Sequence, residues 1–161
     1  MSRRTIARIA RPFAFLVALL CCPPPAWAVP APRWEPPPAG LLDEVNRHRA
    51  AAGCPSVRLR DSLSRAAQRH SADMSHHERL SHAGTDGSRP VDRMRAAGYR
   101  PGPAGEVIAA GSTTPRGTVA LWMESPSHRA IVLTCRYTDA GVGVADGPGG
   151  PWWTLDLAAG R

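Results

Sequence analysis

The most regular hydrophobic pattern of the chain lies between residues 61 and 74, where apolar positions recur every three or four residues. They are Leu63, Ala66, Ala67, His70 and Met74. This spacing is typical of one face of an α-helix. Asp61 at its start is a good N-cap residue, because a carboxylate accepts hydrogen bonds from the first-turn N–H groups. The pattern predicts a helix that is capped by Asp61 and buries one side.

Three shorter stretches also carry helix signals. Apolar residues keep helical spacing from residue 41 until Gly53, and residues 90–97 end at Gly98. Residues 115–122 open with a proline, which is favoured in the first turn of a helix. We therefore expect three further helices, the first of about three turns.

The periodicity changes to a two-residue alternation near the C-terminus. Residues 141–144 and 152–157 have the alternation of two β-strands, separated by a glycine-rich turn at residues 146–150. Val57 and Leu59 alternate with arginines and predict one short extended segment. Helices first and a hairpin last predict an α+β fold with an antiparallel sheet, not a doubly wound one.

The N-terminal residues have the composition of an export signal. Four arginines and no acid accompany the apolar run 13–22, and an Ala-Trp-Ala sequence ending at Ala28 supplies the small side chains that signal peptidase recognises. The run is too short for a bilayer-spanning helix, which needs about 20 residues. Leu20 stands where a lipidation motif needs a small residue before Cys21. We predict a secretory signal peptide and no stable membrane anchor.

These signals divide the chain into a signal peptide (1–28, cleaved after Ala28), a proline-rich linker (29–38) and one folded domain (39–161). The protein is then expected to be secreted and extracellular. Its net charge of +7 falls to +3 when the four arginines of the signal are removed, and the remaining arginines alternate with acids, so no nucleic-acid binding is expected. The absence of lysine excludes Schiff-base enzymes and P-loop nucleotide sites. No sustained heptad pattern is present in the domain, and we expect a monomer.

Cys54 and Cys135 are the two cysteines beyond the predicted cleavage site. An even pair in an oxidising compartment predicts a disulfide between them. Because the bond would close a long loop, the chain-entropy estimate of its stabilisation is roughly 4.5 kcal/mol. The alternative at this point is two independent buried thiols.

The histidines and serines by themselves identify no active site. His77 and His82 are five residues apart, whereas the helical zinc-protease motif needs histidines four apart. No Gly-x-Ser-x-Gly sequence is present, so a standard serine hydrolase has no support. His70 lies on the apolar face of its predicted helix, and we expect it to be a core histidine that is hydrogen-bonded to the main chain.

Five segments nevertheless occur in the order and at the spacing of one known family. They are Ala-x-x-His-Ser-x-Asp-Met at 67–74, Leu-Ser-His at 80–82, Gly-Glu-Val-Ile at 105–108, Trp-x-x-Ser-Pro-Ser-His-Arg at 122–129, and Gly-Val-Gly at 141–143. In this ordered set the chain resembles the CAP superfamily, also called the SCP/PR-1-like domain, in its short secreted bacterial form. The resemblance covers about residues 39–161, the whole predicted domain.

The resemblance implies an α-β-α sandwich with a central antiparallel sheet. It also implies a cleft in which two histidines and one or two acids converge, in some members around zinc. Matched residue by residue, these are His82, His128 and Glu106. Two imidazoles, a carboxylate and a water suit Zn²⁺, so we expect Zn²⁺ as a possible cofactor of this cleft.

The chain departs from the family pattern at three positions. Members with a second acid have it three residues after the tryptophan, where Ser125 follows Trp122, whereas Glu124 falls one residue earlier. Glu124 is therefore a doubtful member of the site. Val107 replaces the usual asparagine after Glu106, and Ser127 replaces the usual glycine before the histidine.

The resemblance leaves three functions open. The favoured one is a non-catalytic binding module that holds a divalent metal, a small ligand or an unknown extracellular partner. The second is an extracellular metal-assisted hydrolase or peptidase, in which Glu106 activates a water while His82 and His128 hold zinc or polarise the substrate. The third is lipid or sterol binding, supported by apolar residues near Trp122 and Trp152, although we expect the tryptophans to pack the core.

Overall fold

The computed structural model describes residues 37–160, and the structural statements below concern this range. The predicted signal peptide lies outside it, as does the predicted linker up to residue 36. Within this range no helix is long and apolar enough to cross a membrane.

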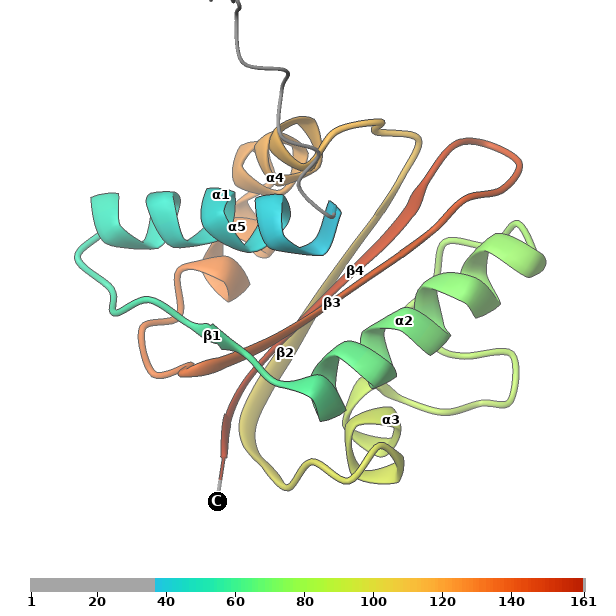
Figure 1. The fold of residues 1–161 in the computed structure, drawn as a ribbon, viewed down its shortest axis with the longest axis horizontal. Coiled ribbons are helices and arrows are strands. Elements are labelled where there is room, and N and C mark those ends of the chain that lie inside the picture. The colour runs from blue at the N-terminus through green and yellow to red at the C-terminus, as the bar shows by residue number, and fades with distance from the viewer. Residues whose placement is uncertain (1–36, 161) are drawn as a thin grey trace, which may run out of the picture. The chain divides into compact units, whose positions relative to one another are not determined.

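Within the described range, five helices and a four-stranded sheet form the domain (Figure 1). The helices are α1 (Pro37–Ala51), α2 (Asp61–His76), α3 (Pro90–Ala96), α4 (Pro115–Glu124) and α5 (Pro126–Val132). The strands are β1 (Arg58–Leu59), β2 (Pro101–Ala110), β3 (Asp139–Ala145) and β4 (Trp152–Gly160). The sheet order is β1-β3-β4-β2, in which β4 pairs antiparallel with β3 and β2, and the two-residue β1 pairs parallel with β3.

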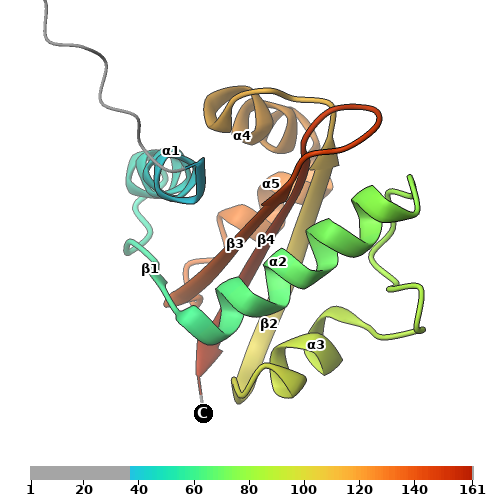
Figure 2. The ribbon, with the colours of Figure 1, turned by 45° about the vertical axis from the view of Figure 1, so that its right-hand side comes forward.

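The helices cover both faces of the sheet (Figure 2). Helices α1, α4 and α5 pack on one face and α2 and α3 on the other. Successive side chains of β4 point to opposite faces of the sheet and contribute to the core on each side. Trp153 and Leu155 are buried with α1 and α4, whereas Trp152 and Ala158 are buried on the opposite face. The α+β class and the α-β-α sandwich with a central, mainly antiparallel sheet are thereby confirmed.

Two glycines let α2 lie directly on β3. A Cβ atom at Gly141 or Gly143 would come closer than 3.0 Å to main-chain atoms of α2. The side chain of Gln68 fixes this contact, because its amide donates to Val144 O (2.8 Å) and accepts from Val144 N (3.1 Å). This close contact sets the height of α2 above the sheet, and therefore the position of His70.

Several element boundaries differ from the sequence predictions. Helix α1 begins at Pro37, inside the predicted linker, since prolines are tolerated in the first turn. Asp61 is the first residue of α2 and Arg60 its N-cap, so Asp61 acts as an acid in the first turn near the helix dipole. Strand β2 and helix α5 were not predicted as elements.

The predicted disulfide between Cys54 and Cys135 is confirmed. Beside it, the buried guanidinium of Arg49 donates hydrogen bonds to four main-chain carbonyls, those of Pro55, Val132, Thr134 and Tyr137. Together they attach the end of α1 to the segment between α5 and β3.

Candidate functional site

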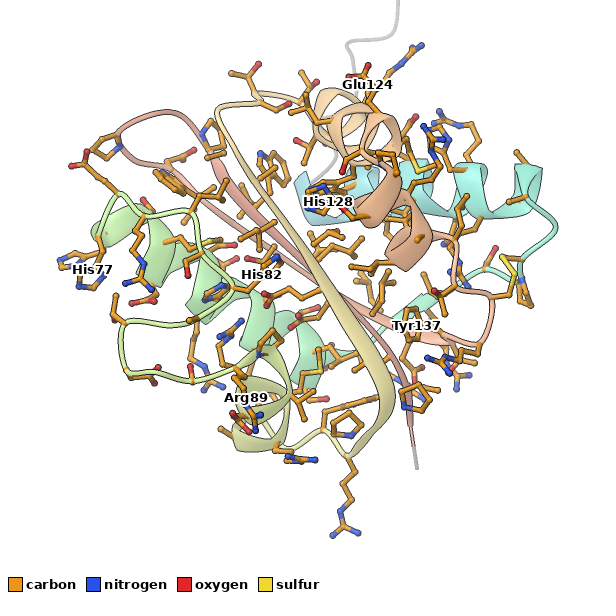
Figure 3. All side chains as sticks on the ribbon, turned by 180° about the vertical axis from the view of Figure 1, so that it is seen from behind. His77, His82, Arg89, Glu124, His128 and Tyr137 are labelled. Atoms are coloured by element: carbon orange, nitrogen blue, oxygen red, sulfur yellow. A yellow bond between two sulfur atoms is a disulfide. The ribbon has the colours of Figure 1, made fainter. Side chains whose placement is uncertain are left out.

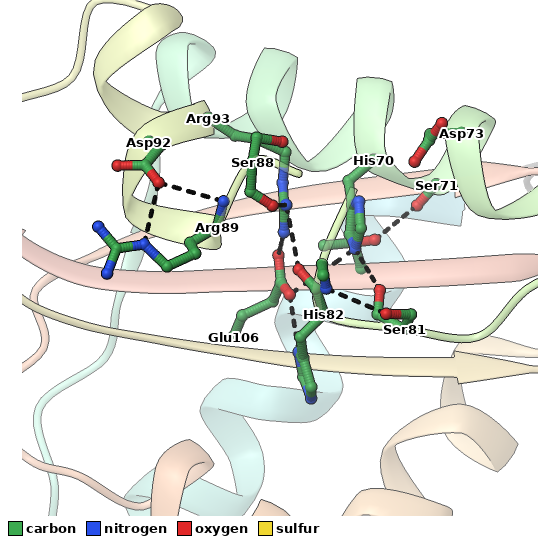
Figure 4. A network of polar contacts seen from close by, with 12 residues as sticks. His70, Ser71, Asp73, Ser81, His82, Ser88, Arg89, Asp92, Arg93 and Glu106 are labelled. Atoms are coloured by element: carbon green, nitrogen blue, oxygen red, sulfur yellow. Dashed lines mark hydrogen bonds and ion pairs between the residues drawn. The ribbon is translucent and has the colours of Figure 1, made fainter. Parts of the chain in front are cut away.

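The centre of the site is a hydrogen bond between His82 and Glu106. Glu106 lies in the middle of β2, where its side chain is only 1% exposed, and His82 lies in the segment between α2 and α3 with a side chain 52% exposed. His82 Nδ1 donates to Glu106 Oε1 at 2.8 Å. The other ring nitrogen points away from Glu106 (Figure 4). A carboxylate that accepts from Nδ1 fixes the tautomer with a lone pair on Nε2.

A buried arginine occupies the second oxygen of Glu106. Arg93 Nη2 of α3 donates to Glu106 Oε2 at 2.6 Å, and both side chains are nearly inaccessible to solvent. Burial alone raises the pKa of Glu106, but the hydrogen bond from His82 and the charge of Arg93 outweigh it and hold this pKa below its ordinary value. Glu106 is therefore an ionised carboxylate with both oxygens engaged.

His70 closes the site from the side of α2. Its ring is fully buried, and burial lowers its pKa more than the nearby Glu106 raises it, so the ring is neutral. His70 Nε2 is 2.9 Å from Ser81 O, to which a neutral ring donates, and 3.8 Å from Glu106 Oε1. The prediction of a core histidine bonded to the main chain is confirmed. Its hydrogen bond to Ser81 O holds the main chain next to His82.

A second carboxyl group lies beside Glu106, on the neighbouring strand β4. Asp156 of β4 is in register with Glu106, is fully buried, and has no hydrogen-bond donor among residues 37–160. Burial and the charge of Glu106 raise the pKa of Asp156 well above its ordinary value. Two ionised carboxylates at this spacing would repel each other strongly, so Asp156 is the protonated member of the pair.

The structure does not join the two remaining predicted residues to this pair. His128 lies in α5, on the opposite face of the sheet from α2 and α3, and Figure 3 shows it across β2 from His82. Glu124 is exposed at the end of α4 and lines a different groove, between α1 and α4. Val107, the replacement next to Glu106, packs in the core of the other layer and does not enter the site.

The described residues do not form the ligand set of a closed zinc centre. No group of three or more His, Cys, Asp or Glu side chains in residues 37–160 is placed to hold a metal ion. Both oxygens of Glu106 already accept hydrogen bonds, and His128 lies across β2, which leaves the imidazole of His82 as the candidate metal donor beside Glu106. Zinc binding at this site therefore stays a prediction.

A groove of about 410 Å³ between α3 and β2 leads to Glu106. Its floor is apolar, with Val91, Met94 and Ala104, and the exposed guanidiniums of Arg89 and Arg95 stand at its edge. A groove of this size can admit a small ligand or one side chain of a partner.

Arg93 and Asp156 are site residues that the sequence analysis missed. Asp156 left a signal, because it shares a strand face with Trp152 and Ala158. A charge on a buried strand face is rare without a partner, so this position was a candidate. Arg93 left no comparable signal, because α3 is only seven residues long and Arg93 is flanked by polar as well as apolar residues.

The fold and the site define an α-β-α sandwich with a buried Arg–Glu–His network at its edge strand. Residues 42–157 match the CAP family, the cysteine-rich secretory protein family. Because this match covers most of the chain, the protein belongs to the CAP family.

Individual relatives agree with this assignment. The chain is 32% identical over 114 residues to the uncharacterized protein YkwD of Bacillus subtilis, covering 71% of this chain and 44% of that protein. An extracellular SCP-domain protein of Bacillus anthracis is 28% identical with a TM-score of 0.66, covering 75% of this chain and 39% of that one. An outer surface protein of Borrelia burgdorferi has the same fold, with a TM-score of 0.69 at 16% identity and coverage of 75% and 90%. The chain thus spans less than half of the two Bacillus proteins.

Proposed function

We propose that the protein is a secreted, non-catalytic binding module in which the imidazole of His82 is the recognition group. The observation that carries this proposal is the hydrogen bond from His82 Nδ1 to the buried Glu106, in a ring that is half exposed. Because the tautomer is fixed, the Nε2 lone pair can accept a hydrogen bond or coordinate a divalent cation.

Three observations support export. The Cys54–Cys135 disulfide is typical of proteins that fold outside the reducing cytosol. The N-terminal residues have the composition of a signal peptide, and the Bacillus anthracis relative is an extracellular protein. The ligand is therefore expected in the medium or at the cell surface.

Zn²⁺ is an exchangeable ligand in this proposal, not a resident cofactor. His82 carries the nitrogen donor that zinc prefers, and Glu106, hydrogen-bonded behind it, would act as carboxylates do behind zinc-bound histidines. Resident zinc centres use three or four protein ligands, a number that the described residues do not bring together.

The contacts of Glu106 also favour binding over hydrolysis. A hydrolase of this design needs Glu106 to take a proton from water, but its carboxylate is 1% exposed and is engaged by His82 and Arg93. Lipid binding has little support, because Trp122, Trp152 and Trp153 are core residues. The groove between α1 and α4 is lined by charged side chains, including Glu44, Arg47 and Arg116.

The proposal is tested by titrating the oxidised protein with Zn²⁺ while the histidine ring signals are followed by NMR. We expect the His82 signal to respond first, and in His82→Ala the remaining histidine signals should no longer respond at the same Zn²⁺ concentration. His48→Ala removes a partly exposed histidine of α1 and serves as the matched control, which should keep the His82 response. An unresponsive His82 in the parent protein would overturn the proposal. His128→Ala shows whether the second imidazole contributes.

Turnover is tested separately with peptide and ester substrates. The proposal expects the parent protein and Glu106→Gln to show the same background rate. A rate in the parent that is lost in a folded Glu106→Gln variant would establish the hydrolase alternative instead.

A further inference from the structure

Arg93 makes more side-chain hydrogen bonds in the site than any of the residues named from the family pattern. Its Nη2 donates to Glu106 Oε2 (2.6 Å), and its Nη1 donates to His82 O (3.1 Å) and to Ser88 O (2.9 Å). Arg93 itself is 8% exposed. One guanidinium from α3 therefore touches both ends of the 82–88 segment and the central residue of β2 (Figure 4).

The contacts of Arg93 reach His82 from two directions. Through His82 O it fixes the main chain from which the ring projects, and through Glu106 it fixes the oxygen that accepts from the ring. The planar fork of an arginine can bond several acceptors in fixed directions, which a lysine ammonium cannot reproduce. The ring of His82 thus has little freedom to rotate while Arg93 is in place.

The charge of Arg93 matters as much as its shape. Glu106 is buried opposite the unpartnered Asp156, and among the described residues Arg93 is the cation in direct contact with it. A buried carboxylate that loses its cation is strongly disfavoured. Removal of the guanidinium would leave Glu106 Oε2 without its donor and free the carboxylate to turn, so that Oε1 would no longer hold the Nδ1–H of His82 in one direction.

We propose that Arg93 is the positioning residue of this site, because its guanidinium holds the His82 main chain and the Glu106 carboxylate as one rigid unit that presents His82 Nε2 outward. The proposal rests on the proposed function, since it explains how the recognition group is held. Arg93 does not touch the ligand and acts through His82 and Glu106.

The test compares Arg93→Met and Arg93→Lys with Arg49→Met. Arg49 is a buried arginine of α1 that donates to the main-chain carbonyls of Val132 and Tyr137, so Arg49→Met destabilises the domain without removing the three hydrogen bonds of Arg93. The first readout is the ¹⁵N NMR signature of the His82 ring, which distinguishes one fixed tautomer from an average of two. The second is the Zn²⁺ affinity.

The parent protein and Arg49→Met should show the Nδ1–H tautomer, whereas Arg93→Met should show averaged ring nitrogens. Arg93→Lys should lie between them, because lysine keeps the charge without the fork. Loss of an orienting partner typically lowers metal affinity 10–100-fold, and we expect about 10-fold for Arg93→Met.

A fixed tautomer in folded Arg93→Met would overturn the proposal, as would equal tautomer averaging in Arg49→Met. If Arg93→Met does not fold, Arg93→Lys gives the same decision, since a parent-like ring signature and affinity would contradict a positioning role. The tautomer readout does not need a ligand. A parent protein that binds no Zn²⁺ would therefore refute the proposed function while still testing Arg93.

Discussion

Replacing Gly143 with alanine tests whether the close contact between α2 and β3 supports the whole domain. The added Cβ would lie closer than 3.0 Å to main-chain atoms of Ala67 and Gln68. Real Cβ atoms essentially never approach other atoms this closely, and a main chain cannot move aside by changing a rotamer. The helix as a unit must therefore move away from the strand.

The expected cost follows from what this movement disturbs. Inserting a methyl group into a packed core costs about 1–3 kcal/mol, and the upper end applies where main chain must move. The two hydrogen bonds between Gln68 and Val144 are also strained, at about 1 kcal/mol each. We expect Gly143→Ala to lower the free energy of unfolding by about 4 kcal/mol, which for a domain of this size lowers Tm by roughly 15 °C.

The assay is urea unfolding of the oxidised protein, followed by the fluorescence of its buried tryptophans. Gly53→Ala is the matched control, because Gly53 has a φ of +76° but a Cβ there meets nothing within 4 Å. Its free energy of unfolding should fall only by about 1 kcal/mol, the cost of an alanine in the left-handed region. If Gly143→Ala lowers the free energy of unfolding no more than Gly53→Ala does, the main chain of α2 does not lie directly against β3.

Three further predictions concern stability. Arg49→Met should lower the free energy of unfolding by about 3 kcal/mol or more in the same urea assay, because four carbonyls lose the donor that a buried guanidinium supplies; an unchanged midpoint would contradict this role. Cys54→Ser with Cys135→Ser should cost roughly 4.5 kcal/mol, and a loss below about 1 kcal/mol would mean that the loop is already ordered without the bond. Asp156 has a raised pKa in the folded state, so its contribution to stability is complete below its unfolded pKa of about 3.9 and is lost as the pH rises, at up to about 1.4 kcal/mol per pH unit. Asp156→Asn does not titrate, so its stability relative to the parent should increase from pH 4 to pH 7; a pH-independent difference would show that Asp156 is ionised in the folded protein.

The sequence predicted the elements in which the pattern of apolar and polar residues matches what is buried and what is exposed in the fold. The apolar stripe of α2 and the alternation of β3 and β4 each report which side of an element is buried, and they were sufficient for the α+β class. The pairing of Cys54 with Cys135 followed from parity once the signal cysteines were set aside. Strand β2 was hidden because Pro101, Gly102 and Pro103 are residues that strands usually exclude, and an edge position tolerates them.

The buried faces of α2, β3 and β4 and the disulfide were predictable from the sequence, and the family pattern pointed to His82 and Glu106 as candidate site residues. Only the tertiary structure placed Arg93 against Glu106 and Asp156 opposite it, and only it left His128 on the other side of β2. The physical reason is that periodicity records whether a side chain is buried but not which group it meets. That partner is set by the register of β2 on β4 and by the packing of α3 against the sheet, and both join residues that are far apart along the chain.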